Sequence, residues 1–167
     1  MAQVLLRPAV DGDESLLYGI YASSRTEELA PAGWDDATLE AFLRMQHAAQ
    51  DRSFRAGHPD ASRDVIVIAG DDAGRLYVDR SRPAIHVIDI ALLPDYRGQG
   101  AGTRLLQALL EEAGCAQRRV TLNVERGNRV RRLYERLGFH VLRDGGVYLD
   151  LEWVPPPAPS PPGAPAR

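Results

Sequence analysis

Residues 85–106 read IHVIDIALLPDYRGQGAGTRLL, which is a strand, a glycine-rich loop and the start of a helix in direct succession. The aliphatic run from Ile85 to Leu92 is typical of a strand buried on both faces. Pro94 ends this strand, because proline has no N–H to give to a sheet ladder. Glycines then follow at every second position, and leucines at helical spacing begin an amphipathic helix after them.

A strand that feeds a helix through glycines is a phosphate-binding arrangement. The first N–H groups of a helix have no partner inside it, and the helix dipole favours an anion there. Glycines remove the Cβ atoms that would hold a diphosphate away, and Arg97 adds a positive charge. A P-loop is excluded because the chain contains no lysine. A dinucleotide-binding loop is excluded because the sixth place from Gly98 is Thr103. The alternative to phosphate binding is that the three glycines only form a tight turn between the strand and the helix.

The other elements follow from periodicity and turn residues. Two helices are expected before residue 57, separated by a loop from Arg25 to Asp36. Asp71 to Gly74 reads as a hairpin turn between two short strands. The strand at 120–124 follows a crossover helix and should therefore run parallel to the strand at 85–92. The expected order is β-α-α-β-β-β-α-β-α-β-β.

Residues 128–139 carry a second motif, NRVRRLYERLGF. It resembles the Asn-x-Ala-x-x-Leu-Tyr-x-x-x-Gly-Phe motif of the GNAT superfamily of N-acetyltransferases, with Val130 in place of the usual alanine. The loop Arg97-x-x-Gly100-x-Gly102 resembles the coenzyme A loop of the same family. The resemblance covers about Val4 to Trp153. It implies an α/β fold, with a mixed, mostly antiparallel seven-stranded sheet that is flanked by about four helices and splayed between strands 4 and 5.

The resemblance also implies acetyl-CoA-dependent transfer of an acetyl group to a primary amine, by direct attack in a ternary complex. The residues implied to wrap the pyrophosphate are Arg97, Gly98, Gln99, Gly100, Ala101, Gly102 and Thr103. The pantetheine arm would pair with the main chain of Ile90, Ala91 and Leu92 and pass near Asn128. Tyr134 would protonate the leaving thiolate, although its spacing also suits core packing. The alternative function is a non-catalytic acyl-CoA-binding or regulatory module.

The base that deprotonates the amine is less defined. Some family members use a Glu on the fifth strand, where this chain has Asn123, which cannot act as a base. Others use one on the fourth strand, where this chain has His86, whose ordinary pKa suits a base near neutrality. Asp89 is the next candidate. Because these two lie an odd number of residues apart, they should point to opposite faces unless the strand is bulged. Two alternatives remain. His86 is a buried histidine whose hydrogen bonds serve only the fold, or a chain of water molecules takes the proton from the amine.

The acceptor site is expected in the loop between the first two helices, where the family usually builds it. Glu28 and Trp34, together with Glu27, stand out there. A carboxylate at this position would pair with a cationic amine. A solvated acidic loop is the alternative.

Composition sets the remaining limits. A chain of 167 residues, 44% of them hydrophobic, suits a single domain, expected over residues 1–154, and the Pro-rich stretch 155–167 is expected to be a disordered tail. The net charge of −3 argues against nucleic-acid binding, and no apolar run reaches membrane-spanning length. No Cys/His pair has zinc-ligand spacing, so no metal is expected. We expect a cytoplasmic protein whose partner is a small-molecule or peptide amine, with a homodimer left open.

Overall fold

The structure, a computed structural model, describes residues 2–158. Its strands form one sheet in the order β1-β2-β3-β4-β5-β7-β6, in which only β4 and β5 run parallel. The strands are β1 (Val4–Pro8), β2 (Ser62–Ile68), β3 (Asp71–Asp79), β4 (Ile85–Leu92), β5 (Val120–Glu125), β6 (His140–Asp144) and β7 (Tyr148–Trp153). The mixed seven-stranded sheet and its parallel crossover confirm the predicted fold class. Most of the Pro-rich tail, from residue 159, lies outside the described residues.

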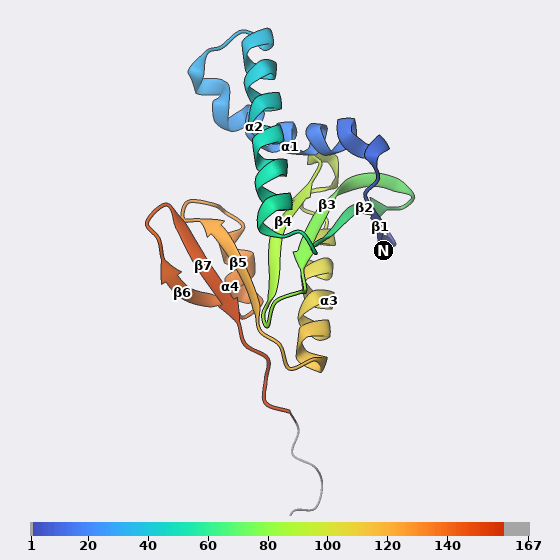
Figure 1. Cartoon of the computed structure of the whole chain (residues 1–167), viewed down its shortest axis with the longest axis vertical. Coiled ribbons are helices and arrows are strands. Elements are labelled where there is room, and N and C mark those ends of the chain that lie inside the picture. The colour runs from blue at the N-terminus through green and yellow to red at the C-terminus, as the bar shows by residue number, and fades with distance from the viewer. Residues whose placement is uncertain (1, 159–167) are drawn as a thin grey trace, which may run out of the picture.

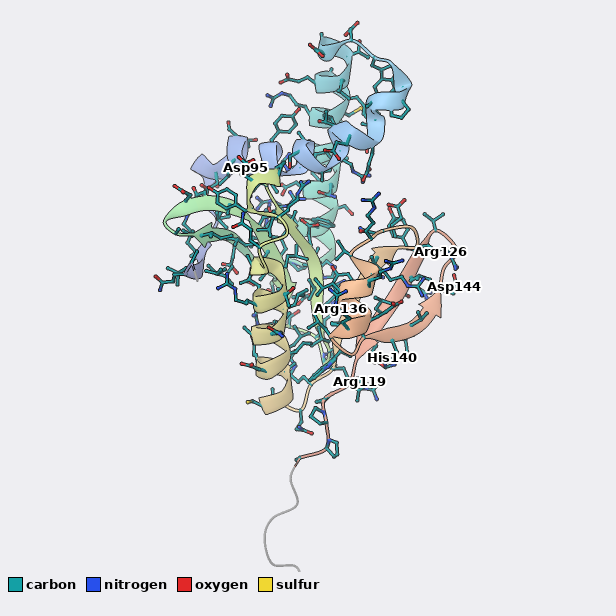
Figure 2. The ribbon with its side chains drawn as sticks, turned by 180° about the vertical axis from the view of Figure 1, so that it is seen from behind. Asp95, Arg119, Arg126, Arg136, His140 and Asp144 are labelled. Carbon is teal, nitrogen blue, oxygen red and sulfur yellow. The ribbon has the colours of Figure 1, made fainter. Side chains whose placement is uncertain are left out.

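Helices cover both faces of the sheet. The α-helices are α1 (Glu14–Leu29), α2 (Asp36–Gly57), α3 (Ala101–Cys115) and α4 (Arg131–Arg136). Figure 1 shows α1 and α2 on one face, and the opposite view in Figure 2 shows α3 and α4 on the other. The leucine stripe of α3 packs against β-strand side chains in the main core, as its helical spacing predicts.

The strands β4 and β5 separate after a short paired stretch. They are paired only from Ile85 to Val87 and from Val120 to Leu122, whereas β3 pairs with β4 as far as Leu92. Figure 1 shows the two strands together at one end and apart at the other, with the opening toward α1. Residues 88–92 therefore have an edge that no strand covers. This opening confirms the predicted splay.

A bulge in β4 changes which side chains share a face. Tyr77 of β3 lies opposite Asp89, but the next residue, Val78, lies opposite Val87, so Ile88 is an extra residue in β4. Because of this insertion, His86 and Asp89 point to the same face of the sheet, the one covered by α2. The expectation of opposite faces was made for a strand without a bulge, so it does not apply to β4.

Two expectations from the sequence are wrong. The turn between β2 and β3 is formed by Ala69 and Gly70, which both have positive φ, and Asp71–Gly74 belongs to β3. Helix α1 continues to Leu29, so Glu27 and Glu28 lie on a helix and not in a loop. Helix α2 then starts where the Asp35 carboxylate accepts a hydrogen bond from the Thr38 N–H at 2.7 Å.

Candidate active site

The glycine-rich loop presents main-chain N–H groups at the start of α3. Gly98 and Gly100 have φ of 71° and 80°, which side chains other than glycine rarely permit. Among the described residues, no carbonyl accepts a hydrogen bond from the N–H groups of residues 98–103. A Cβ added at Gly98 or Gly100 would meet no atom within 4 Å, so the space above the loop is open. The arrangement suits a diphosphate at the N-terminus of a 15-residue helix.

Arg97 holds its positive charge between this loop and the end of β4. Its Nε donates to the Leu92 carbonyl at 2.8 Å, and its Nη2 donates to Ser23 Oγ of α1 at 3.2 Å. The Leu92 carbonyl keeps a second lone pair for another donor. Ile90, Ala91 and Leu92 themselves lie on the uncovered edge of β4. The structure thus brings the predicted pantetheine edge and the predicted pyrophosphate loop together in one continuous path.

The other residues predicted in this path lie in the loop, in the first turn of α3 and just before α4. The Gln99 side chain donates to the Asp95 carbonyl at 2.7 Å, in the turn labelled in Figure 2, and Ala101 is buried beneath the loop. Thr103 lies in the first turn of α3. Asn128 uses its side-chain oxygen locally, where it accepts from the Val130 N–H at 3.0 Å and organises the turn before α4.

Tyr134 lies in α4 and is almost fully buried, with its ring edge-on to Phe139 at 5.7 Å. Burial, with a further contribution from the charge of Asp89, raises the pKa of Tyr134 to about 12. The phenol is therefore protonated at every physiological pH. The Asp89 carboxylate thus acts on the Tyr134 hydroxyl across the splay.

Asp89 is held by a buried arginine on the face covered by α2. Arg75 of β3 donates through Nε to Asp89 Oδ2 at 2.6 Å and through Nη2 to Gln50 Oε1 of α2 at 2.9 Å. The Asp89 side chain is 24% exposed, so part of its carboxylate remains accessible from the opening. This accessible part of the Asp89 carboxylate is suited to accept hydrogen bonds from an ammonium group.

His86 lies farther along the same face, at the closed end of the splay. Its Nδ1 is 2.9 Å from Thr121 Oγ1 of β5. Burial is the main cause of a lowered pKa for His86, with smaller contributions from the positive charges of His58 and Arg82. The ring is therefore neutral near pH 7. A cavity of about 320 Å³ opens beside it, lined by His58, Arg82, Ala84, His86, Thr121 and Asn123.

The structure does not bring Glu28 and Trp34 to this cavity. Glu28, in the last turn of α1, pairs with Arg25 at 2.8 Å, and Trp34 packs edge-on against Phe42 of α2 at 5.0 Å. Both are exposed, in a corner that projects beyond the sheet on the side where the splay opens (Figure 1). A larger cavity of about 720 Å³ between α1 and α2 contains none of the predicted site residues.

Sequence reasoning missed the polar residues of β3 that line this face. Arg75, Tyr77 and Asp79 alternate with buried aliphatic residues, so the period-two pattern was available as a signal. His58 follows α2 between Gly57 and Pro59, two residues that end helices, so the local sequence gives no sign of a site there. It contacts Asp79 across 21 positions of sequence, a distance that no local pattern spans.

The model of the acetyltransferase (GNAT) family matches residues 26–139, which include the splay, the glycine-rich loop and α4. The chain belongs to the GNAT acetyltransferase family. The match covers more than half of the chain and both motifs on which the resemblance was based. Membership of this family supports acyltransferase activity.

Solved structures agree with this GNAT assignment. PaiA N-acetyltransferase from Thermoplasma acidophilum, in complex with coenzyme A, matches with a TM-score of 0.68 and 16% identity over 91% of this chain and 99% of that one. A histone acetyltransferase HPA2-related acetyltransferase from Corynebacterium glutamicum matches with a TM-score of 0.67 and 22% identity over 96% and 99%. An acetyltransferase from Thermus thermophilus matches with a TM-score of 0.65 and 19% identity, over 91% of this chain and 97% of that one. At these identities the likenesses establish the fold alone.

Curated relatives are not found, nor are metal-binding clusters or membrane-spanning helices among the described residues. No curated protein sequence matches the chain. Within residues 2–158, no three His, Cys, Asp or Glu side chains are grouped closely enough to hold a metal ion. No helix in this part of the chain is both long and apolar enough to cross a membrane.

Proposed function

We propose that this protein is an acetyl-CoA-dependent N-acetyltransferase that acts on a primary amine by direct attack in a ternary complex. The observation that carries the proposal is the continuity between the uncovered edge of β4 at residues 88–92 and the free N–H groups of residues 98–103. A thioester with a diphosphate at its far end needs both features in this order. The cytoplasm is the compartment we propose for this reaction.

The donor would bind through main-chain groups and one charge. The pyrophosphate lies on the N–H groups between Gly98 and Thr103, beside Arg97. The pantetheine arm pairs with the main chain of Ile90 to Leu92 as an added strand would, and Asn128 lies on its other side. The acetyl group then reaches the splay, between Asp89 and Tyr134.

The chemistry follows from the groups that face this point. The acceptor approaches as an ammonium ion attracted by Asp89, loses a proton to His86, and attacks the thioester carbonyl. The oxyanion of the tetrahedral intermediate is stabilised by main-chain N–H near Leu92. The C–S bond then breaks and the coenzyme A thiolate leaves. It takes up the second N–H proton of the tetrahedral intermediate, so that the amide and the free thiol form.

Tyr134 is the group we propose to stabilise this thiolate. With a pKa of about 12, it holds its proton more tightly than a thiol, whose ordinary value is about 8.5. Donation of a hydrogen bond to the sulfur is therefore favoured over complete proton transfer in the free protein. An ammonium bound at Asp89 would offset the negative charge that raises the pKa of Tyr134, so that the phenol becomes more acidic when the acceptor is present.

The test is release of free thiol from acetyl-CoA in the presence of a panel of small amines and peptides with free N-termini. We expect turnover with at least one amine and a mass increase of one acetyl group on that amine. Thermal stabilisation by coenzyme A without turnover of any acyl-CoA would instead indicate a binding module. Glu28→Gln and Trp34→Ala test whether the corner between α1 and α2 takes part in binding the amine. If it does, we expect KM to change for the amine and not for acetyl-CoA.

A further inference from the structure

A second histidine, His58, is paired with a buried carboxylate beside the cavity that His86 lines. His58 follows α2 directly, and its Nδ1 lies 2.7 Å from Oδ2 of Asp79, the last residue of β3. The two side chains are 17% and 2% exposed. The proposed reaction uses Asp89, His86 and Tyr134, and this buried Asp–His pair has no role in it.

The carboxylate of Asp79 is ionised and firmly held. It accepts hydrogen bonds from the main-chain N–H of Ser81 at 2.9 Å and from the Ser81 hydroxyl, and it lies 3.3 Å from Nε of Arg82. These donors, with His58, keep the pKa of Asp79 far below its usual range. An ionised carboxylate only accepts hydrogen bonds, so Nδ1 of His58 carries the hydrogen, and in the neutral ring Nε2 has a free lone pair.

His58 and His86 form the wall of one cavity. Their rings are stacked, with centroids 5.3 Å apart and an angle of 14° between planes. Each ring has its Nδ1 engaged, one by Asp79 and the other by Thr121, which leaves each Nε2 for the cavity. At about 320 Å³ the cavity has room for several water molecules.

The cavity is close to the point where the amine would react. Because of the bulge at Ile88, His86 and Asp89 lie on one face and are separated by two steps of the ladder with β3. Two steps along a strand span about 7 Å. Water in the cavity can therefore connect the reacting amine, at Asp89, with both histidines.

We propose that the Asp79–His58 pair is the final acceptor of the proton that the amine loses, with His86 as the first acceptor and cavity water between them. The inference rests on the proposed acetyl transfer. The amine N–H gives its proton to His86 Nε2, and His86 gives it through water to His58 Nε2. His58 thereby becomes an imidazolium, while Asp79 keeps its charge and His86 returns to the neutral form. The proton leaves to solvent through the open side of the cavity.

The surrounding charges give this transfer its direction. A cation on His86 faces Arg82 and is in direct contact only with the neutral Thr121, while the carboxylates of Asp79 and Asp150 act on it without contact. A cation on His58 also faces Arg82 and His86, but it is in direct contact with the Asp79 carboxylate. The charge is thus better stabilised on His58. In this scheme Asp79 is a positioning residue, since it acts through His58.

The decisive variants are H58N and H58A, with H140N as the matched control. Asparagine keeps a donor for Asp79 but cannot take up a proton. His140 pairs with Glu152 on the β6–β7 edge (Figure 2), away from the cavity, so it reports on loss of a His–carboxylate contact as such. We expect H58N to lower kcat by about 100-fold with KM for acetyl-CoA unchanged. Added imidazole should restore much of the activity of H58A, and H140N should behave like the wild type.

Wild-type kcat in H58N, or an H58A variant that is slow and indifferent to imidazole, would overturn the proposal. If the wild type releases no thiol with any amine, the proposed function fails, and the Asp79–His58 pair is still judged by nitrogen NMR. There His58 should carry its hydrogen on Nδ1, and D79N should remove that preference. A hydrogen on Nε2 of His58 in the wild type contradicts the inference whatever the activity.

Discussion

The Nε of Arg75 and Oδ2 of Asp89 lie 2.6 Å apart, in an ion pair that joins β3 to the part of β4 that borders the splay. The Arg75 side chain is only 4% exposed. Removing one partner of a buried pair leaves an uncompensated charge, which costs about 3–5 kcal/mol. We therefore expect R75M to lower the free energy of unfolding by about 3 kcal/mol, measured by urea denaturation.

The matched control for this substitution is R80M, which removes one partner of the exposed Arg80–Glu112 pair. Its cost should stay below about 1 kcal/mol. The double variant R75M/D89L, which replaces both charges by apolar groups, should recover much of the loss. An R75M protein no less stable than R80M would mean that the Arg75–Asp89 pair does not support the strand.

The ionisation of Tyr134 provides a second expected outcome. Its pKa is raised to about 12, mainly by burial, whereas an unfolded tyrosine ionises near 10. Above pH 10 the unfolded chain loses this proton before the folded chain does, so stability that is fully present below pH 10 is lost as the pH rises toward 12. In an ultraviolet titration of the chain's six tyrosines, Y134F should lack the phenol that titrates last. An unchanged curve would show that Tyr134 is more accessible than the structure has it.

Tyr134 also has an expected effect on catalysis. Y134F removes the hydrogen bond to the departing thiolate and should lower kcat by about 100-fold. Binding of coenzyme A, measured by calorimetry, should stay the same because the main chain provides most of its contacts. The control is Y148F, at a tyrosine that is 53% exposed on β7. Equal activity of Y134F and wild type would remove Tyr134 from the mechanism.

Gly102 separates helix stability from binding of the diphosphate. A Cβ at Gly102 would meet only Leu92 Cδ1, at 4.0 Å, and glycine inside a helix is less favourable than alanine by about 0.5–1 kcal/mol. G102A should therefore raise the melting temperature of the free protein while it weakens coenzyme A binding, because the methyl group stands among the exposed N–H groups.

Gly114, near the other end of α3, is the matched control. A Cβ there would make an ordinary contact of 3.8 Å with Trp153. G114A should raise the melting temperature without changing the dissociation constant of coenzyme A. If both variants bind coenzyme A equally well, the start of α3 does not hold the diphosphate.

Gly74 is required for a different reason, close approach of two main chains. A Cβ at Gly74 would lie 2.2 Å from the carbonyl oxygen of Ala91, on the side of β4 that pairs with β3. G74A must displace β4 and should destabilise the fold by at least about 2 kcal/mol, as overpacking does. G19A, where a Cβ meets nothing within 4 Å in α1, should instead be neutral or stabilising. Equal stability of the two variants would contradict the register of β3 and β4.

The sequence predicts the parts of this structure that depend on local patterns. The aliphatic run at 85–92, the glycines after it and the motif at 128–139 predict the strand β4, the loop and α4, whereas the splay is implied by the family resemblance that these motifs carry. The turn at Ala69–Gly70 was missed because alanine rarely adopts a φ of 53°, and the acidic run after it looked more like a turn. The end of α1 was missed because polar helix residues before Pro31 carry no periodicity.

The candidate site depends on contacts that cross the sequence. Whether His86 and Asp89 share a face is decided by how β3 pairs with β4, and the sequence of β4 alone contains no sign of the extra residue. The contact between His58 and Asp79 requires both the end of α2 and the end of β3 to reach the same corner. Such contacts follow from tertiary packing, so the sequence provided His86 and Asp89 as candidates but neither His58 nor Arg75.

The extra residue at Ile88 changes which residue numbers of β4 share a face. His86 lies on the α2 face before the insertion, whereas the odd-numbered Asp89 and Ala91 lie on that face after it. A chain of this fold without that residue would offer a different side chain to the acceptor at the same alignment column. Anyone who redesigns acceptor choice on this strand must therefore treat residues 85–87 and 89–92 as two separate templates, joined by an insertion that sets their relative phase.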